Sequence, residues 1–277
     1  MAAQYHQRQA AGTQWDPQQY LKFSDHRLRP ALELLERVAL ESPRLIYDLG
    51  CGDGQMARLM AERWPEAQVC GLDNSPQMLA QAAEAQTAEA ASRIEWVEAD
   101  VQHWSPAESP DLIYSNATLQ WLDGHAALFP RLVESLAAGG CLAVQMPLSW
   151  GMPSHRLMRE TLADGGPNGT SLGTESLRLS VARKWVEDAG DYYDLLVGCT
   201  SSLDIWETEY LQALAGDDPV LEWVKGTGLR PILNSLAGEK RERFLAEYAR
   251  RLRVAYPAKS NGLTLYPFRR LFLVATH

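Results

Sequence analysis

Short apolar runs alternate with amphipathic helical patterns along the first 150 residues of the chain. Runs bounded by glycine, proline or polar residues are typical of buried strands, whereas apolar residues three and four positions apart predict the helices between them. Repeated strand–helix–strand units favour a parallel sheet with helices on both faces. The candidate strands are Leu45–Leu49, Val69–Asp73, Ile94–Val97, Leu112–Tyr114 and Cys141–Met146.

The helices between these strands carry recognisable end signals. Ser24 or Asp25 can cap a helix that extends to Leu40. The pair Ser75–Pro76 supplies a cap and a first-turn proline for an Ala-rich helix that we expect to reach about Ala91. Both helices are therefore predicted from their ends as well as from their periodicity.

The second half of the chain is less regular. An alternating run, Leu203–Tyr210, and a closing apolar run, Leu271–Ala275, predict two further strands and bring the sheet to seven. The segments before and between these runs are longer than ordinary connections. We therefore expect residues 151–198 and 211–266 to be insertions on the substrate side. The helical patterns in these segments lie around Leu157, Val220–Val224 and Phe244–Leu252.

These patterns predict a doubly wound, mostly parallel, seven-stranded α/β sheet with helical lid insertions. Residues 1–14 are polar and show no strand or helix pattern, so we expect a mobile tail. Residues 15–277 are expected to form a single domain, in which residues 15–40 provide an N-terminal lid helix.

Composition and charge narrow the class of protein. The 277 residues include 35 acidic and 26 basic side chains, which gives a formal net charge of −9, and 46% of the residues are hydrophobic. These proportions are ordinary for a globular protein in water, and the negative charge disfavours nucleic acid and anionic membranes as partners. An anionic ligand would need a local cluster of cations.

The cysteines and the N-terminal residues indicate the cellular compartment in which the protein is expected. Cys51, Cys70, Cys141 and Cys199 are far apart and form no Cys-x-x-Cys pair, so we expect neither a disulfide framework nor a metal site. No run approaches the roughly 20 apolar residues of a membrane span, and the first residues lack the apolar core of a signal peptide. We expect a cytoplasmic protein with no membrane partner, and the sequence leaves the oligomeric state open.

A glycine-rich loop directly after the first predicted strand carries the strongest cofactor signal. The run Asp48–Gly54 reads Asp-Leu-Gly-Cys-Gly-Asp-Gly and opens the next predicted helix. Glycine allows a sharp turn and the close approach of a ligand. Asp73 ends the second strand, where its carboxylate can accept both hydroxyls of a ribose, and Asp100 after the third strand can meet an adenine amino group. An adenosine-containing cofactor is therefore expected at the carboxyl ends of the strands.

Two cofactors compete for this loop. The spacing Gly52-x-Gly54-x-x-Ala57 fits the dinucleotide fingerprint, but Asp48 and Gly50 occupy the turn at which that fingerprint normally begins. The acid-x-Gly-x-Gly-x-Gly run resembles instead the first motif of class I S-adenosylmethionine (SAM) methyltransferases. The resemblance implies a Rossmann-like methyltransferase fold with SAM as cofactor. The cofactor contacts that it implies are Asp48, Gly50, Cys51, Gly52, Asp73, Asn74, Asp100, Val101 and Asn116, with Tyr20 and Phe23 as lid aromatics over the cofactor.

Further motifs are similar to those of trans-aconitate methyltransferases, and the likeness covers essentially everything after the first 14 residues. Two positions depart from the family pattern: Asp53 and Arg269 stand where proline is usual. We expect Asp53 to change the stiffness of the loop rather than the identity of the cofactor. The motifs that carry the resemblance are Trp15–Phe23, Arg27–Pro30, Ser115–Trp121, Gln145–Pro147, Pro153–His155, Trp223–Pro231 and Arg270–Phe272.

This resemblance implies transfer of the SAM methyl group to a carboxylate of a small tricarboxylic acid. Carboxylates are already ionised at pH 7, so no residue is needed as general acid or base, and proximity and orientation carry the reaction. A polyanionic substrate needs cations, and the planar fork of arginine suits carboxylates. The expected substrate-binding residues are Arg29, Arg230 and Arg270, together with Gln120, Trp121, His155, Tyr192 and Tyr193.

Two other functions stay open. A malonyl-carrier-protein O-methyltransferase would use the same chemistry on a tethered carboxylate and would show a basic surface patch, whereas an enclosed arginine pocket would oppose it. A non-catalytic SAM-binding module would hold the cofactor without an acceptor cavity. Nucleobase methylation is disfavoured, because Ser115–Thr118 replaces the Asn/Asp-Pro-Pro-aromatic loop of those enzymes.

Overall fold

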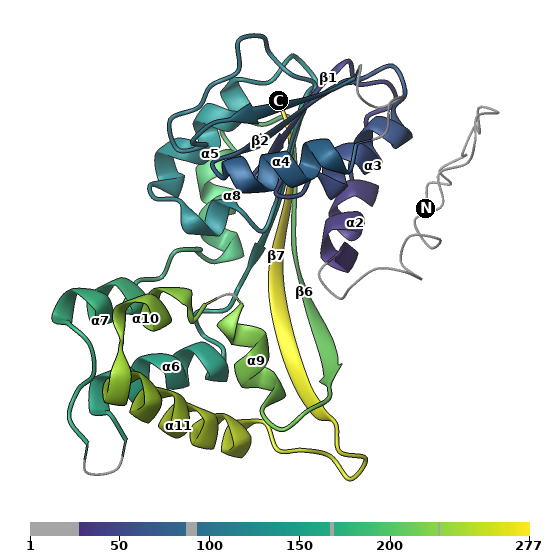
Figure 1. The fold of residues 1–277 in the computed structure, drawn as a ribbon. Helices are drawn as coiled ribbons and strands as arrows, with labels where there is room; N and C mark the ends of the chain where they lie inside the picture. Colours follow the sequence, from purple (N-terminus) through teal and green to yellow (C-terminus); the bar gives the residue numbers. More distant parts are fainter. Residues whose placement is uncertain (1–27, 87–92, 167–168, 227) are drawn as a thin grey trace, which may run out of the picture.

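A computed structural model describes residues 28–86, 93–166, 169–226 and 228–277, and seven strands form one sheet (Figure 1). The order across the sheet is β3-β2-β1-β4-β5-β7-β6, and β7 alone runs against its neighbours. All seven predicted strands are present, and the predicted doubly wound, mostly parallel fold class is confirmed. The strands are β1 (Leu45–Leu49), β2 (Gln68–Asp73), β3 (Ile94–Glu98), β4 (Leu112–Asn116), β5 (Cys141–Pro147), β6 (Ser202–Leu214) and β7 (Thr264–Thr276).

Helices cover both faces of this sheet. The helices α2 (Leu28–Glu36) and α3 (Gln55–Arg63) pack on one face, and α5 (His125–Glu134) and α8 (Ala189–Leu196) pack on the other. Helix α4 (Pro76–Glu84) lies beside β2 and β3. The connections from β1 and β2 to these helices turn at the carboxyl ends of the strands, which is where ligands bind in folds of this kind.

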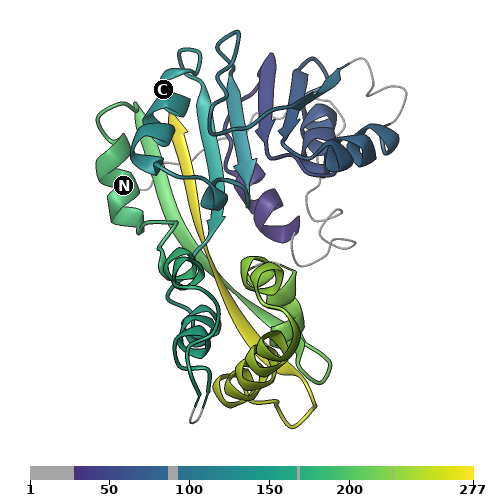
Figure 2. The same cartoon turned by 60° about the vertical axis from the view of Figure 1, so that its left-hand side comes forward.

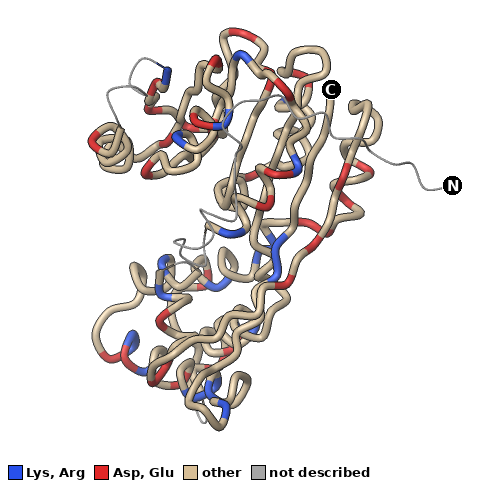
Figure 3. The backbone as a smooth tube through the Cα atoms, turned by 90° about the vertical axis from the view of Figure 1, so that its right-hand side faces the viewer, with Lys and Arg blue, Asp and Glu red and all other residues tan. Residues whose placement is uncertain are grey.

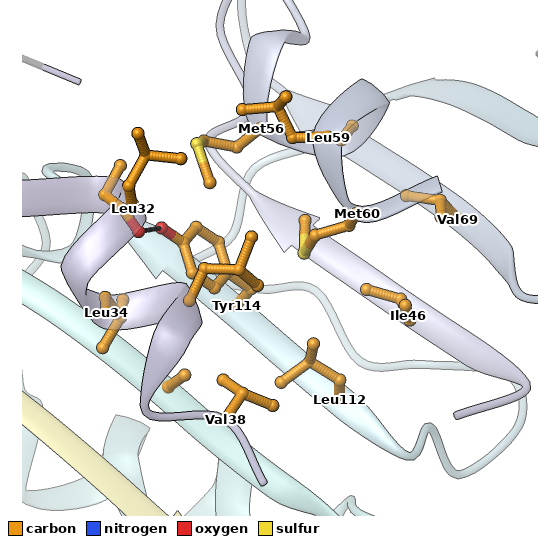
Figure 4. Packing of buried hydrophobic residues seen from close by; sticks show 14 of the residues in the cluster. Leu32, Leu34, Val38, Ile46, Met56, Leu59, Met60, Val69, Leu112 and Tyr114 are labelled. Carbon is orange, nitrogen blue, oxygen red and sulfur yellow. Dashed lines mark hydrogen bonds between the residues drawn. The ribbon is translucent and has the colours of Figure 1, made fainter. Parts of the chain in front are cut away.

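Helix α2 is held in the core by apolar packing. Leu32 and Leu34 of α2 belong to one buried apolar cluster with Met56 and Met60 of α3, and the hydroxyl of Tyr114 donates to the carbonyl oxygen of Ala31 at 2.7 Å (Figure 4). Each fully buried leucine contributes about 1.5–3 kcal/mol to stability. The described part of the predicted 15–40 helix is therefore a core element, and its role as a lid stays a prediction.

The strands β6 and β7 pair over 13 residues each, and the far part of this two-stranded ribbon, from Arg269 to Thr264 of β7, extends past the end of β5. Five helices gather around the far end of this ribbon (Figures 1 and 2). We call these helices the cap; it has its own apolar cluster, in which Phe244 and Tyr248 lie close to Tyr266 and Phe268 of β7. The cap helices are α6 (Pro153–Asp164), α7 (Glu175–Ala182), α9 (Pro219–Lys225), α10 (Arg230–Ser235) and α11 (Gly238–Ala255).

Two helix boundaries differ from the sequence prediction. Helix α2 ends at Glu36 rather than Leu40, where two hydrogen bonds of 3₁₀ type tighten its last turn. Helix α4 has the predicted Ser75 cap and Pro76, but it ends at Glu84. The side chain of Gln86 bonds β3 instead, accepting from Trp96 and donating to Ile94. The predicted extension to Ala91 is wrong at residues 85 and 86, and residues 87–92, Ser24 and Asp25 lie outside the described part of the chain.

The helices α7, α8 and α10 were not predicted. Each has eight residues or fewer and little apolar periodicity. Their end signals were nevertheless present in the sequence: the Thr174 side chain accepts from the backbone of Leu177, and Asp188 and Asp191 form a capping box at α8. Helix α8 lies within the predicted 151–198 insertion yet packs on the sheet rather than in the cap, and the substrate-side role of both insertions stays a prediction.

Candidate active site

The glycine loop between β1 and α3 is fixed to the end of β2 by three hydrogen bonds, from the N–H groups of Gly50, Cys51 and Gly52. The backbone N–H groups of Gly50 and Cys51 donate to the carbonyl oxygen of Leu72 at 2.7 and 2.8 Å. The carboxylate of Asp73 accepts from the N–H groups of Gly52 and Ser75, both at 2.9 Å. Each carboxylate oxygen has a second acceptor position, so Asp73 can hold the loop and still accept hydroxyl groups from a ligand.

The glycines of this loop serve different purposes. A Cβ on Gly50, at φ +72°, would lie 2.2 Å from the side chain of Thr118, so the loop after β4 packs directly on this residue. A Cβ on Gly52, at φ +56°, would meet only Met78 Cε at 3.4 Å. Gly50 is therefore required for packing between two loops, whereas Gly52 leaves its open side to a ligand.

Asp48 is a buried carboxyl at the inner end of the loop. The N–H of Ala57, in the first turn of α3, donates to it, but no described residue is a hydrogen-bond partner of its Oδ2 atom. Burial, and after it the nearby charge of Asp73, raise the pKa of Asp48 to about 7. An unpaired buried carboxylate oxygen is unfavourable, so this position fits a cationic group of a ligand.

The loop after β4 places polar atoms next to the glycine loop. Ala117 has φ +55°, and Thr118 donates its hydroxyl to the carbonyl oxygen of Gly50 at 3.3 Å. Gln120 donates to Ala117 O at 2.6 Å. Within the described ranges, the side-chain oxygens of Asn116 and Gln120 are buried and have no hydrogen-bond partner. We call the 3₁₀ turn Leu119–Trp121 the acceptor turn; the side chain of its Trp121 is largely exposed.

Eight of the predicted cofactor residues converge at the carboxyl ends of β1 to β4. Asp100 is exposed after β3 and accepts from Gln102 N at 2.9 Å, and Asn74 lies between Asp73 and Ser75. Val101 is buried in the core on the α5 face, which favours packing over cofactor contact. Tyr20 and Phe23 lie outside the described residues. The converging residues are Asp48, Gly50, Cys51, Gly52, Asp73, Asn74, Asp100 and Asn116.

Arg270 brings a cation to the same edge of the sheet. Its side chain is only 6% exposed, and its Nη1 donates to Gln145 Oε1 at 2.7 Å. Its guanidinium carbon lies 4.6 Å from the centre of the Phe268 ring. Gln145 is the register partner of Asn116 on β4. Arg270 lies on β7 between the cap residue Phe268 and the sheet residue Phe272. Figure 3 shows basic residues along the segments where the sheet and the cap meet.

Arg29 lies at the beginning of α2, near this cation. Its Nε donates to Glu33 at 2.8 Å, and its guanidinium lies 5.2 Å from the centre of the Tyr210 ring. Glu33, Tyr210 and Gln145 were not among the predicted site residues. Gln145 stood within a quoted motif, but the contacts of Glu33 and Tyr210 join residues that are 177 positions apart, and no local pattern marks them.

Two predicted substrate residues are placed away from these polar groups. Tyr192 is buried below the acceptor turn and donates its hydroxyl to His125 Nδ1 at 2.6 Å, while His125 Nε2 donates to Leu119 O at 2.9 Å. Burial lowers the pKa of His125, which keeps this chain of hydrogen bonds in its neutral form. Tyr193 is exposed on α8. This placement favours support of the turn for Tyr192 and gives Tyr193 no contact with the site.

His155 and Arg230 both belong to the cap. His155 Nδ1 lies 3.2 Å from Ser154 Oγ, and its Nε2 would be 2.8 Å from a Cβ on Gly228. Burial lowers the pKa of His155 to about 4, so the ring is neutral near pH 7. Arg230 is exposed as the first residue of α10. Their contact with substrate stays a prediction.

The described part of the chain offers neither a metal-binding cluster nor a membrane-spanning helix. No group of three or more histidine, cysteine, aspartate or glutamate side chains in those residues could hold a metal ion. None of the helices described is long and apolar enough to cross a membrane.

The seven-stranded sheet, the glycine loop and the acidic residues at the ends of β1 and β2 define a SAM-dependent methyltransferase of the Rossmann-like class. Residues 46–140 match the family model of a methyltransferase domain. The trans-aconitate 2-methyltransferase of Streptomyces avermitilis is 49% identical, with 96% of this chain and 98% of that protein covered. The enzyme of the same name from Azoarcus sp. is 45% identical over 94% of this chain and 98% of its own length. The chain belongs to the trans-aconitate 2-methyltransferase family, and its cofactor is SAM.

Solved structures with low sequence identity agree on the fold. The YcgJ protein of Bacillus subtilis superimposes with a TM-score of 0.58 at 11% identity, over 91% of this chain and 98% of that one. The phosphoethanolamine N-methyltransferase 2 of Haemonchus contortus, in complex with S-adenosyl-L-methionine, gives 0.53 at 17% identity. That match covers 90% of this chain, which spans about half the length of the worm enzyme. The predicted family, cofactor and enzyme class are thus confirmed.

Proposed function

We propose that this enzyme transfers the methyl group of SAM to a carboxylate oxygen of trans-aconitate or a similar small polycarboxylic acid. The carboxylate oxygen forms the new O–CH₃ bond as the S–CH₃ bond breaks, and the bonding pair stays on sulfur. The products are a monomethyl ester and S-adenosylhomocysteine. The observation that supports this proposal most directly is Arg270, a buried cation at the carboxyl edge of the sheet, fixed by Gln145 where the sheet meets the cap.

Two acidic side chains at the ends of β1 and β2 offer acceptor positions that suit this cofactor. We assign the ribose hydroxyls to Asp73 and the α-ammonium group to the buried carboxyl of Asp48, whose Oδ2 has no partner in the described ranges. The open side of Gly52 admits the cofactor backbone, and Asp100 is assigned to the adenine amino group. Bound SAM supplies an electrophilic methyl group on a sulfonium, and the protein supplies the orientation of that group.

The residues of the chain act on the acceptor through position and charge. The acceptor carboxylate is ionised near pH 7, so it needs no base. The guanidinium of Arg270 can bind one carboxylate of the acceptor while another faces the methyl group. Attack by an anion on a sulfonium neutralises charge, so a site that excludes water favours the transition state over the separated ions. Gln120 and Trp121, on the acceptor turn, are assigned to the wall of this site.

A methyl-transfer screen tests the proposal. The purified protein is incubated with SAM and one acceptor at a time: trans-aconitate, cis-aconitate, isocitrate or a malonyl-carrier protein. Mass spectrometry then measures the masses of the products. Ester formation on trans-aconitate supports the proposal, and the absence of ester on every small acid contradicts it. Ester on the carrier protein alone supports the alternative, which the enclosed position of Arg270 disfavours. Cofactor binding without any product would identify a non-catalytic SAM-binding module.

The place of action follows from the substrate class. A small tricarboxylic acid and SAM are both solutes of the cytoplasm, and we propose that the enzyme acts there. Fractionation of the source cells, with the ester-forming activity as the readout, tests this proposal.

A further inference from the structure

Three side chains form a polar cluster beside Arg270, where α2 crosses the β6–β7 ribbon. The hydroxyl of Tyr210 on β6 donates to Glu33 Oε2 at 2.5 Å, and Arg29 Nε donates to Glu33 Oε1 at 2.8 Å. The Arg29 guanidinium also lies over the Tyr210 ring. One carboxylate therefore receives two donors, in an arrangement that any carboxylate could adopt.

Tyr210 and Arg270 belong to the same face of the ribbon. Tyr210 is the register partner of Phe268, and Arg270 lies two residues further along β7, so both side chains point to the side covered by α2. Burial and the hydrogen bond to Glu33 raise the pKa of Tyr210, whereas the charges of Arg270 and Arg29 lower it. The phenol thus stays a hydrogen-bond donor near pH 7, and two cations lie within electrostatic reach of it.

The three side chains of the cluster differ in how easily they can change position. Tyr210 is only 4% exposed and is fixed by its neighbours in the core. The side chains of Arg29 and Glu33 are 60% and 28% exposed, so either can turn into water without creating a buried charge. An exposed ion pair of this kind is easily rearranged. Glu33 is therefore the member that can leave while the phenol stays in place.

The docking of α2 does not depend on Glu33. Leucine side chains of α2 fill the core on this face, and the hydroxyl of Tyr114 holds the carbonyl oxygen of Ala31. At the other end of the helix, Arg63 donates to the carbonyl oxygens of Leu35 and Val38 at 2.5 and 3.1 Å. Release of the Glu33 carboxylate can therefore occur without loss of the helix from the sheet.

We propose that Tyr210, with Arg29, is a second subsite for a carboxylate of the acceptor, and that Glu33 occupies this subsite until the acceptor displaces it. This inference rests on the proposed function, because it takes the acceptor to be a polycarboxylate held first by Arg270. A polyanion bound at Arg270 repels the Glu33 carboxylate. One of its own carboxylates can then accept the hydrogen bond of the Tyr210 hydroxyl in place of Glu33. The exchange replaces one carboxylate by another at the same phenol and makes or breaks no covalent bond.

Equilibrium binding of trans-aconitate to the protein saturated with S-adenosylhomocysteine tests the exchange without turnover. In Tyr210→Phe, loss of the donor should weaken acceptor binding about tenfold or more, since a hydrogen bond to a charged group is lost. In Glu33→Gln, loss of the competing charge should tighten acceptor binding about threefold to tenfold. In the double variant the gain from Glu33→Gln should disappear, because its effect acts through Tyr210.

Glu36→Gln is the matched control, because it removes the same charge from an exposed position one turn along α2. It should leave the acceptor affinity within about twofold of the original. Melting curves establish that each variant is folded, and if Tyr210→Phe does not fold, Glu33→Gln decides alone. Weaker acceptor binding in Glu33→Gln would overturn the inference, because Glu33 would then serve to hold Arg29 and Tyr210 in place. An unchanged affinity in either single variant would overturn it too.

The same measurements separate this inference from the proposed function. If the original protein binds trans-aconitate but forms no ester, the proposed reaction fails, and the variants still decide the role of Tyr210. If it forms the ester and the variants do not behave as described, the second subsite is wrong and the reaction stands. If it binds no polycarboxylate at all, both proposals are overturned.

Discussion

The buried guanidinium of Arg270 donates from Nη1 to Oε1 of Gln145 at 2.7 Å and so joins β7 to β5 where the sheet meets the cap. A neutral amide orients the guanidinium without cancelling its positive charge. The contact joins residues that are 125 positions apart. Gln145 is in turn the register partner of Asn116 on β4, whose buried side-chain oxygen has no partner among the described residues.

Arg270→Lys is expected to weaken the acceptor interaction selectively. Lysine keeps the charge but loses the planar fork, so the acceptor KM should rise about tenfold or more while the affinity for S-adenosylhomocysteine changes little. Arg269→Gln is the control, because Arg269 lies on the opposite face of β7 and pairs with Glu207. Steady-state kinetics with each substrate varied in turn measures the difference. Equal changes for acceptor and cofactor would indicate a general disturbance of the sheet.

Cofactor binding should depend on pH through Asp48. The raised pKa of this buried carboxyl, about 7, means that the ligand-free protein holds a proton there below pH 7. The ammonium group of the cofactor needs the ionised form, so binding of S-adenosylhomocysteine should tighten about tenfold between pH 6 and pH 8. Isothermal titration calorimetry in buffers of different ionisation heat measures both the affinity and the proton released.

Asp48→Asn separates this effect from other titrations. The variant should bind S-adenosylhomocysteine weakly and with little change between pH 6 and pH 8. Rising pH affects stability in the opposite direction: it strengthens cofactor binding but weakens the contribution of Asp48 to the stability of the ligand-free fold. Since the folded state holds the proton more tightly than the unfolded chain does, the contribution of Asp48 to stability is present at low pH and is lost as the pH rises through about 7. Ligand-free Asp48→Asn should therefore melt higher than the original protein at pH 8, and the difference should shrink steadily as the pH falls toward the unfolded-state pKa of about 4.

Asp73→Ala is expected to weaken cofactor binding by about tenfold or more, because a carboxylate that accepts several hydrogen bonds is removed. Part of the loss comes from the loop, since Gly52 and Ser75 lose their acceptor. Asp73→Asn keeps one acceptor oxygen and should retain more affinity than Asp73→Ala. Asp53→Ala, an exposed carboxylate on the same loop, is the control. Unchanged calorimetric affinity in a folded Asp73→Ala would remove Asp73 from the ribose role.

The strands and the glycine loop could be predicted from the sequence because their signals are local. A strand buried on both faces reads as an apolar run, and Asp48–Gly54 and Asp73 follow two such runs directly. The contacts Gln145–Arg270 and Glu33–Tyr210 join distant segments, so they depend on the order of the strands and on the packing of α2. The short helix α8 was missed for want of apolar periodicity, and with it the burial of Tyr192 behind the acceptor turn.

Tyr192→Phe distinguishes support of the acceptor turn from direct binding of substrate. Removal of the hydroxyl leaves Nδ1 of the buried His125 without its donor, which should lower the free energy of unfolding by about 1–2 kcal/mol. The acceptor KM should change much less than in Arg270→Lys, because the Tyr192 hydroxyl bonds to His125 and to the N–H of Glu187. Tyr193→Phe, on the exposed side of the same helix, should alter neither quantity. Chemical denaturation and acceptor kinetics on the same preparations give both numbers. A large rise in acceptor KM with unchanged stability would return Tyr192 to the substrate site, as the sequence first predicted.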